Sequence, residues 1–172
     1  MSGLPKIFIT DIDGVWTDGG MYYDQTGNEF KKFNTSDSAG VLFLHYLKIP
    51  VIIITSENTE IVNKRSLKLK IDRLYQGVKD KVSTAIQICD EFQVDMDEIA
   101  YIGDDLNDIP LLKIAGYSCT TRNAPDYVKK HCKYITNKAG GEGAFREFVE
   151  IILNEHDLLD EVIRIHLNSI QE

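Results

Sequence analysis

The sequence predicts an α/β fold, a doubly wound parallel sheet of the Rossmann-like kind with helices on both faces. Three continuous apolar runs, residues 7–9, 51–54 and 99–102, have the length and composition of strands that are buried on both faces. Segments with helical spacing separate these runs, and right-handed crossovers then place helices on both sides of the sheet. Each run ends in polar residues, which favours an active site at the carboxyl edge of the sheet.

The other elements are expected between these runs. Two short aromatic segments, 21–23 and 30–33, flank the polar turn 24–29, and this pattern is typical of a β-hairpin. The expected helices and remaining strands are helices at 39–47, after Ser56, at 80–92, 108–115 and 124–131, and strands at 73–75, 117–120 and 134–135.

Two of these elements carry further expectations. Ser56 can cap the helix that follows it, with Glu57 and Glu60 in the first turn. A helical tail runs from about residue 145 to 172, and the sequence does not decide whether it packs on its own domain or on a neighbouring subunit.

Composition indicates an ordinary globular protein. With 43% apolar and 27% charged residues, the chain fits one domain over residues 1–172, with the hairpin inserted at about 17–34. A net charge of −8 argues against a nucleic-acid partner or an anionic membrane surface. The three cysteines are widely spaced and odd in number, and no run approaches transmembrane length, so we expect reduced thiols in the cytoplasm.

Polar residues with a chemistry in common follow the expected strands. In chain order they are Asp11 with Asp13, then Thr55, then Lys81, then Asp104 with Asp105 and Asp108. The carboxyl ends of parallel strands meet at one edge, so we expect these groups to converge. Carboxylates suit Mg²⁺, a threonine and a lysine can hold phosphate, and a carboxylate can attack phosphorus while another handles the proton of the leaving alcohol.

Each of these features alone has a simpler explanation. A pair of aspartates can cap a turn, Thr55 can start a helix, and Lys81 can be a surface charge. Their joint occurrence, each at the end of an apolar run, favours a phosphoryl-transfer site.

These segments resemble the four motifs of the haloacid dehalogenase superfamily of phosphotransferases: residues 11–15, Thr55, Lys81 and residues 103–108. The resemblance implies that Asp11 is the nucleophile and becomes phosphorylated. It implies that Asp13 is the general acid and base, with a backbone carbonyl that binds Mg²⁺, and that Asp104 completes the metal site. The residues implied to hold the phosphoryl group are Thr55, Ser56 and Lys81, with Asp105, Asn107 and Asp108 in support.

The spacing of the motifs indicates which branch of the superfamily the chain resembles. Neither the interval from Asp13 to Ser36 nor that from Thr55 to Lys81 can hold a cap domain. The cap-less relatives that the chain most resembles, through residues 17–20, 33–40 and 140–147, are tetrameric phosphatases of keto-deoxy sugar acids. The resemblance therefore implies a homotetramer and a small sugar phosphate as substrate.

Two substrates compete within that group: 3-deoxy-manno-octulosonate 8-phosphate, and sialic-acid-type nonulosonates phosphorylated at carbon 9. The octulosonate enzymes typically carry Gly-Arg after the second-motif threonine, whereas Ser56 and Glu57 stand here. The glutamate in place of arginine predicts the nonulosonate 9-phosphate and a role in sialic acid metabolism, with the octulosonate as the alternative. Ser56 departs from the glycine that is usual in both groups. Arg65 and Lys68 are expected to bind the sugar carboxylate, across a subunit boundary, although a solvated basic helix face explains them equally well.

Two other classes of protein remain as alternatives. A response-regulator receiver also combines an aspartate cluster with a lysine, but its lysine follows the acidic motifs, whereas Lys81 precedes residues 103–108. A structural oligomerisation domain with vestigial activity is the other alternative. The intact Asp11, Asp13, Lys81 and Asp104 argue against such decay.

Overall fold

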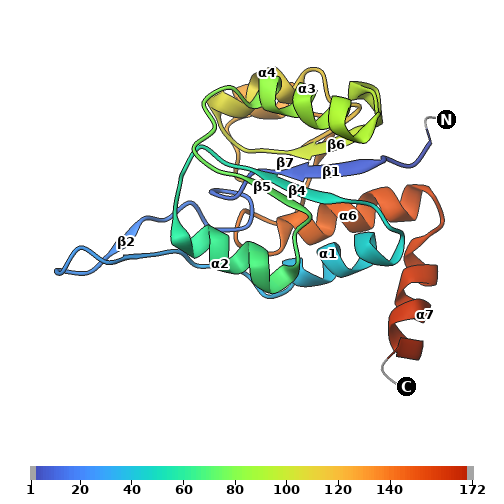
Figure 1. The fold of residues 1–172 in the computed structure, drawn as a ribbon, viewed down its shortest axis with the longest axis horizontal. Helices are drawn as coiled ribbons and strands as arrows, with labels where there is room; N and C mark the ends of the chain where they lie inside the picture. Colours follow the sequence, from blue (N-terminus) through green and yellow to red (C-terminus); the bar gives the residue numbers. More distant parts are fainter. Residues whose placement is uncertain (1–2, 170–172) are drawn as a thin grey trace.

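The computed structural model describes residues 3–169 and shows a parallel sheet between two layers of helices (Figure 1). The strands are β1 (Ile7–Thr10), β4 (Val51–Ile54), β5 (Arg73–Tyr75), β6 (Ile99–Ile102), β7 (Tyr117–Thr120) and β8 (Tyr134–Ile135). Their order is β5-β4-β1-β6-β7-β8, and every pair is parallel. The chain winds outward from β1 in both directions, so the doubly wound fold predicted from the sequence is confirmed, with its switch point beside β1.

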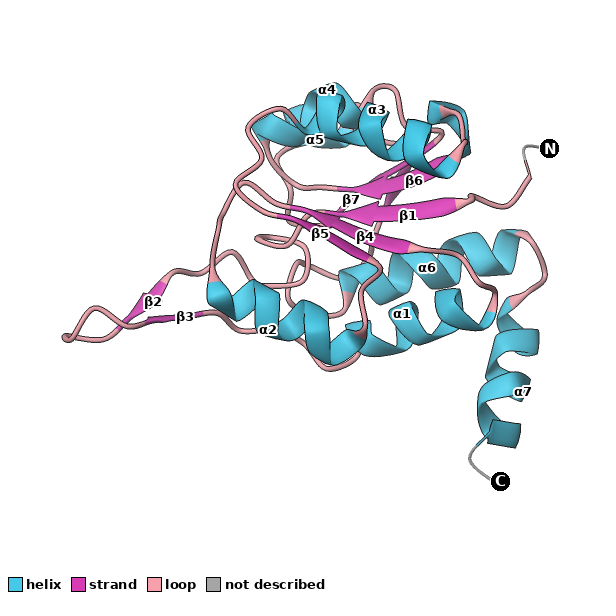
Figure 2. Ribbon diagram, viewed as in Figure 1, coloured by secondary structure: helices cyan, strands magenta, loops and turns pink. Residues whose placement is uncertain are grey.

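Helices cover both faces of this sheet (Figure 2). One layer holds α1 (Asp37–Tyr46), α2 (Glu60–Leu69) and α6 (Ala144–Glu155), and the other holds α3 (Lys81–Phe92), α4 (Ile109–Leu112) and α5 (Asp126–Lys129). Two 3₁₀ turns, Met96–Glu98 (η1) and Leu106–Asp108 (η2), flank β6. None of the described helices has the length and apolar character needed to cross a membrane.

The two apolar cores explain the continuous apolar runs of the sequence. Alternate side chains of a strand point to opposite faces, so Phe8 packs against α1 and α6 while Ile7 and Ile9 pack against the layer of α3. The residues of β1, β4 and β6 are all buried, because both faces of the sheet are covered.

A hairpin of β2 (Tyr22–Tyr23) and β3 (Glu29–Phe30) projects beyond the sheet, at the left of Figure 1. Residues 21–28 are all exposed, and an isolated bridge between Thr17 and Phe33 closes the base of the hairpin. Within residues 3–169 the hairpin is the only structure inserted between β1 and α1, which agrees with the predicted absence of a cap domain.

The C-terminal tail packs on its own chain as far as it is described. Helix α7 (Leu159–Ser169) leaves the body at the lower right of Figure 1 and lies against α1. Its Val162 is buried, and His166 Nδ1 lies 2.9 Å from the Tyr46 hydroxyl. The last part of the predicted tail, residues 170–172, lies outside the described residues.

Three helix predictions need correction. Helix α2 begins at Glu60 and is capped by the Thr59 hydroxyl, which accepts from the Val62 N–H, so Ser56 is not its cap and Glu57 lies outside its first turn. The helix starts late because residues 56–59 bond instead to the loop after β5, where the Gly77 N–H donates to the Glu57 carbonyl. The helices expected at 108–115 and 124–131 are the shorter α4 and α5.

Candidate active site

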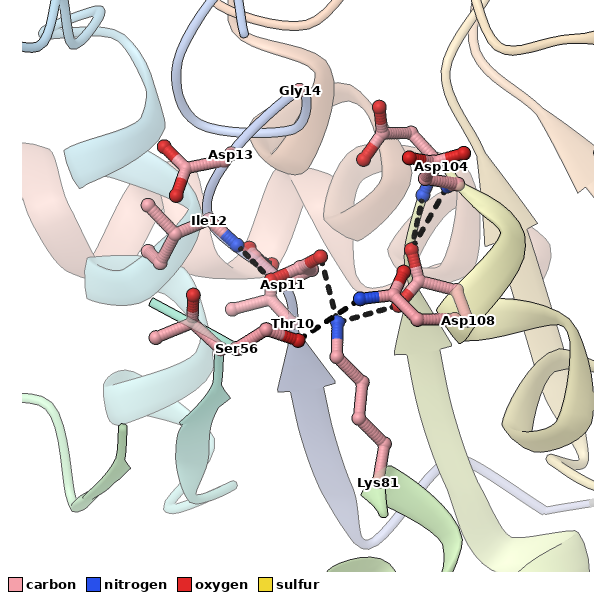
Figure 3. Close-up of polar contacts among 12 residues, drawn as sticks. Thr10, Asp11, Ile12, Asp13, Gly14, Ser56, Lys81, Asp104 and Asp108 are labelled. Atoms are coloured by element: carbon pink, nitrogen blue, oxygen red, sulfur yellow. Dashed lines mark hydrogen bonds and ion pairs between the residues drawn. The ribbon is translucent and has the colours of Figure 1, made fainter. Parts of the chain in front are cut away.

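Asp11 is the first residue beyond β1 and is almost wholly buried, with 6% of its surface exposed. Its Oδ1 accepts a hydrogen bond from the Ile12 N–H at 2.8 Å, and its Oδ2 lies 2.7 Å from Lys81 Nζ (Figure 3). Both oxygens therefore have a fixed position at the carboxyl edge of the sheet.

Lys81 is the first residue of α3, which begins here because the Asp80 side chain caps it. Its ammonium lies between Asp11 and Asp108, 2.6 Å from Asp108 Oδ1. The Tyr101 hydroxyl donates to the same oxygen at 2.6 Å. Because Asp108 is fully buried and held in this way, it aims the Lys81 ammonium at Asp11.

The other oxygen of Asp108 organises the loop after β6. It accepts hydrogen bonds from the Asp104 N–H at 2.8 Å and the Asp105 N–H at 3.0 Å. Gly103 is required beside it, because a side chain there would overlap the Asp108 carboxylate. Asp108 therefore contacts both Lys81 and the backbone of the loop after β6.

The cluster carries more negative than positive charge. Burial, with repulsion from Asp108, raises the pKa of Asp11 to about 7, although Lys81 opposes the shift. Burial and then repulsion from Asp11 and Asp108 raise the pKa of Asp104 to about 8. Burial alone lowers the pKa of Lys81, but attraction to Asp11 and Asp108 outweighs it and the pKa is raised. One fixed ammonium therefore faces several carboxylates.

The carboxylates fit a hard divalent cation. Oxygens of Asp11, Asp104 and Asp108 all lie within 4.8 Å of one another. Asp104 Oδ1 is buried and has no hydrogen-bond partner among residues 3–169. Each oxygen of Asp108 already accepts two hydrogen bonds, whereas each oxygen of Asp11 has one partner. Asp11 and Asp104 are therefore the carboxylates with capacity left for an ion such as Mg²⁺.

The loop of residues 11–17 is held in place by contacts with Thr10, Phe145 and Gly141. The Trp16 indole N–H donates to the Thr10 hydroxyl at 2.8 Å, and its ring stacks on Phe145 with centroids 4.7 Å apart. The Gly141 N–H donates to the Val15 carbonyl at 3.1 Å. Gly14 passes so close to Asp104 that only a residue without Cβ fits, and its φ of +82° is one that glycine favours.

A cavity of about 310 Å³ opens over this edge. It is lined by Asp11, Asp13, Gly14, Gly19, Thr55, Ser56, Glu57, Asp104, Asp105 and Asn107. Thr55 is buried at the end of β4, and the Asn107 amide donates to the Ser56 hydroxyl at 2.9 Å, which joins the loops after β4 and β6. Most of the residues predicted from the sequence thus line one cavity.

The Asp13 side chain lies outside the carboxylate group formed by Asp11, Asp104 and Asp108. Its carboxylate lies apart from the chain of contacts around Lys81 (Figure 3) and binds Lys31, with Nζ 2.7 and 2.6 Å from the two oxygens. The Thr17 hydroxyl adds a longer contact of 3.3 Å. The expected role of the Asp13 backbone carbonyl stays a prediction.

The sequence reasoning missed Lys31, Tyr101 and Thr17. Lys31 follows β3, and its side chain is 1% exposed although the hairpin that supplies it projects into solvent. The sequence of residues 30–33 gives no signal of this, because its two aromatic residues fall on opposite faces of a strand. In the structure the side chains alternate: Phe30 and Lys32 are exposed while Phe33 packs against the core. That alternation places Lys31 on the inner face.

The proposed specificity residues of α2 lie outside the cavity lining. Arg65 is half-buried, donates to the Asn34 carbonyl at 3.2 Å and lies over the Phe33 ring. Lys68 is exposed farther along the helix. Within one chain they are not brought to Asp11, whereas Glu57 is exposed at the cavity.

Comparison with known proteins agrees with this geometry. The profile of the haloacid dehalogenase-like hydrolase family matches residues 44–147. The 3-deoxy-D-manno-octulosonate 8-phosphate phosphatase of Haemophilus influenzae is 34% identical over 86% of this chain and 82% of that protein. The same enzyme from Moraxella catarrhalis, solved with a magnesium ion, a phosphate ion and KDO, has a TM-score of 0.90 at 33% identity, over 94% of this chain and 93% of that one.

A probable YrbI-family phosphatase from Pseudomonas syringae is similar to the same extent, with a TM-score of 0.91 at 37% identity, over 95% of this chain and 93% of that one. Family profile, relatives and fold point the same way. The chain belongs to the haloacid dehalogenase-like hydrolase family.

Proposed function

We propose that this protein is a Mg²⁺-dependent phosphatase that hydrolyses the phosphomonoester of a keto-deoxy sugar acid through a phosphorylated Asp11. The placement of Asp11 carries the proposal. Its carboxylate lines the cavity, 2.7 Å from the Lys81 ammonium and with its second oxygen bound to a backbone N–H. A nucleophile with a fixed direction avoids much of the entropic cost of attack.

The proposed reaction has two steps. A bond forms between an Asp11 oxygen and phosphorus while the bond from phosphorus to the sugar oxygen breaks. Asp13 enters this step as the carboxylic acid, gives that oxygen its proton and becomes the carboxylate. Water then attacks the phosphorus and gives a proton to Asp13, and the bond to Asp11 breaks to release phosphate. Lys81, Thr55 and Ser56 hold the phosphoryl oxygens in both steps.

The proposed ligands of Mg²⁺ are the carboxylates of Asp11 and Asp104 and the backbone carbonyl of Asp13. When bound, the ion supplies positive charge that offsets the carboxylates and the phosphate dianion. The orphaned Asp104 Oδ1 and the raised pKa values of Asp11 and Asp104 support this placement.

The first candidate substrate is 3-deoxy-manno-octulosonate 8-phosphate. The names of the relatives favour it over the nonulosonate 9-phosphate expected from the sequence, which is not confirmed. Glu57 keeps the nonulosonate as a second candidate, because a carboxylate stands at the cavity where the octulosonate enzymes are expected to carry arginine.

We further propose that the enzyme is a homotetramer in which Arg65 and Lys68 serve a neighbouring site. The cavity has no arginine or lysine among its described lining residues, so a sugar carboxylate needs a cation from elsewhere. Hairpin aromatics Tyr22, Tyr23 and Phe30 are 46%, 61% and 55% exposed, a patch suited to subunit contacts.

The test is kcat/KM for both sugar phosphates, with Mg²⁺ and with EDTA. We expect turnover with Mg²⁺ only, and the larger kcat/KM identifies the substrate. Arg65→Ala should lower kcat/KM on that substrate by about tenfold. An unchanged value would leave Arg65 with its structural contacts to Asn34 and Phe33 of its own chain. No turnover of either sugar would favour the vestigial oligomerisation domain.

A further inference from the structure

Lys31 is a buried lysine that the hairpin contributes to the active site. Its side chain is 1% exposed, whereas the side chain of Lys32 is 65% exposed. A buried ammonium is costly unless it is paired, so its partner fixes where it lies. That partner is Asp13, with both oxygens within 2.7 Å of Nζ, while the Glu29 carboxylate is 3.9 Å away.

We propose that Lys31 is a positioning residue for Asp13, which it holds at the cavity wall in the orientation needed to pass a proton to the leaving oxygen. The inference rests on the proposed function, since it assigns a support to the proton-transfer group of that reaction. Nothing in the four motifs of the site points to this lysine.

The inference depends on a difference between Asp11 and Asp13 in the contacts that hold each carboxylate in place. Asp11 is held by a backbone N–H and by Lys81 within a buried network. Asp13 is 29% exposed at its side chain, and apart from Lys31 the 3.3 Å contact from Thr17 is the only hydrogen bond to its carboxylate among residues 3–169. Without Lys31, the Asp13 side chain would be free to turn toward solvent.

Lys31 acts through Asp13 and does not touch the substrate. It is absent from the lining of the cavity, and its ammonium donates hydrogen bonds to both Asp13 oxygens. It directly follows β3, and the bridge between Thr17 and Phe33 fixes the chain on the other side. The base of the hairpin therefore sets the position of the group that transfers the proton.

The experiment compares Lys31→Met with Lys32→Met, a matched change at the exposed neighbour. Two substrates separate positioning from general damage: the sugar phosphate, whose alkoxide must be protonated as it leaves, and p-nitrophenyl phosphate, whose leaving group departs as a stable anion. We expect Lys31→Met to lower kcat on the sugar phosphate by about ten- to a hundredfold, with KM changed less than about threefold. Release of p-nitrophenolate in the first turnover should change less than about threefold.

Lys31→Arg, which keeps the charge, should restore kcat to within about fivefold of wild type. If Lys31→Met does not fold by circular dichroism, Lys31→Gln takes its place with the same expectations. Equal losses on both substrates, or a Lys31→Met enzyme within twofold of Lys32→Met, overturn the positioning role alone. A wild-type protein that hydrolyses neither sugar phosphate overturns the proposed function, and this inference with it.

Discussion

At the carboxyl edge of the sheet and at the tip of the hairpin the chain turns at a glycine of positive φ. The glycine at the edge is crowded by other atoms, whereas the glycine at the tip has open space around it. Gly14 has φ +82° and no room for a Cβ beside Asp104, whereas Gly27 has φ +89° and no atom within 4 Å of a Cβ. The turn at the tip is closed by its own residues, since the Asp24 carboxylate accepts from Thr26 and Asn28. The edge is closed by residues far apart in sequence, such as Asp11, Lys81 and Asp108.

This difference shows what each region can tolerate. At the edge, each charged group is fixed by another group of the site, so one change displaces several. At the tip, the contacts are local and the side chains face solvent, so a change should stay local. Lys31 joins the two regions, because it lies in the hairpin and binds the edge.

The largest expected effect tests the chemistry of the edge. Asp11→Asn keeps the shape but removes the nucleophile, and we expect kcat to fall by about a thousandfold or more. The measurement is phosphate release from both sugar phosphates and from p-nitrophenyl phosphate. Asp126→Asn, at an exposed carboxylate of α5, is the control and should leave kcat unchanged. Near wild-type turnover in Asp11→Asn would rule out the covalent mechanism.

The second prediction compares the two glycines directly. Gly14→Ala must displace the Asp104 carboxylate and strain the backbone, and we expect kcat to fall by about a hundredfold. Gly27→Ala meets the same backbone strain in open space, so it should cost about 1 kcal/mol in stability and leave kcat unchanged. Steady-state kinetics and urea unfolding of both variants check this. Similar kcat in the two variants would mean that crowding at Gly14 does not matter.

The edge was the more predictable of the two regions. Strands with both faces buried give uninterrupted apolar runs, and the polar residues that follow them are adjacent in sequence to those runs, so Asp11, Thr55 and Asp104 could be placed from the sequence. Lys81 could be placed because it follows the short strand expected at 73–75 and lies at the start of the helix expected at 80–92.

The contacts that the sequence did not reveal are those between distant segments. The pairing of Lys31 with Asp13 depends on how the hairpin folds back, and the bond from Tyr101 to Asp108 depends on the loop after β6. The start of α2 was wrong for the same reason: its preceding loop bonds to the loop after β5, and local capping preferences do not report that contact.

The third prediction concerns Asp37, where the chain returning from the hairpin enters α1. Asp37 is fully buried and accepts the Arg146 N–H at 3.1 Å. Burial raises its pKa to about 6, against the opposing effects of Arg146, Arg65 and Lys138. The folded state therefore binds more protons than the unfolded state between about pH 4 and pH 6, and the stability contributed by this carboxyl falls as pH rises through that window.

Asp37→Asn removes this titration. We expect the free energy of unfolding of the variant minus that of wild type to increase by about 1–3 kcal/mol from pH 4 to pH 7, so that the variant becomes relatively more stable. Urea unfolding at both pH values, followed by circular dichroism, measures the difference. Asp126→Asn is again the control, and its difference from wild type should not vary with pH. A pH-independent difference for Asp37→Asn would show that the buried carboxyl titrates normally.

The smallest expected effect concerns the two hydrogen bonds that Asp108 Oδ1 accepts, and it tests whether the site functions with one of them removed. Tyr101→Phe removes one of the donors to Asp108 Oδ1, but the Lys81 ammonium still holds that oxygen at 2.6 Å. We therefore expect a loss of about 1 kcal/mol in stability and about a two- to fivefold fall in kcat. Tyr127→Phe, at an exposed tyrosine of α5, should change neither quantity. A loss of kcat in Tyr101→Phe as large as that in Gly14→Ala would mean that Asp108 cannot position Lys81 without the tyrosine hydroxyl. Each hydrogen bond to Asp108 Oδ1 would then be necessary for activity.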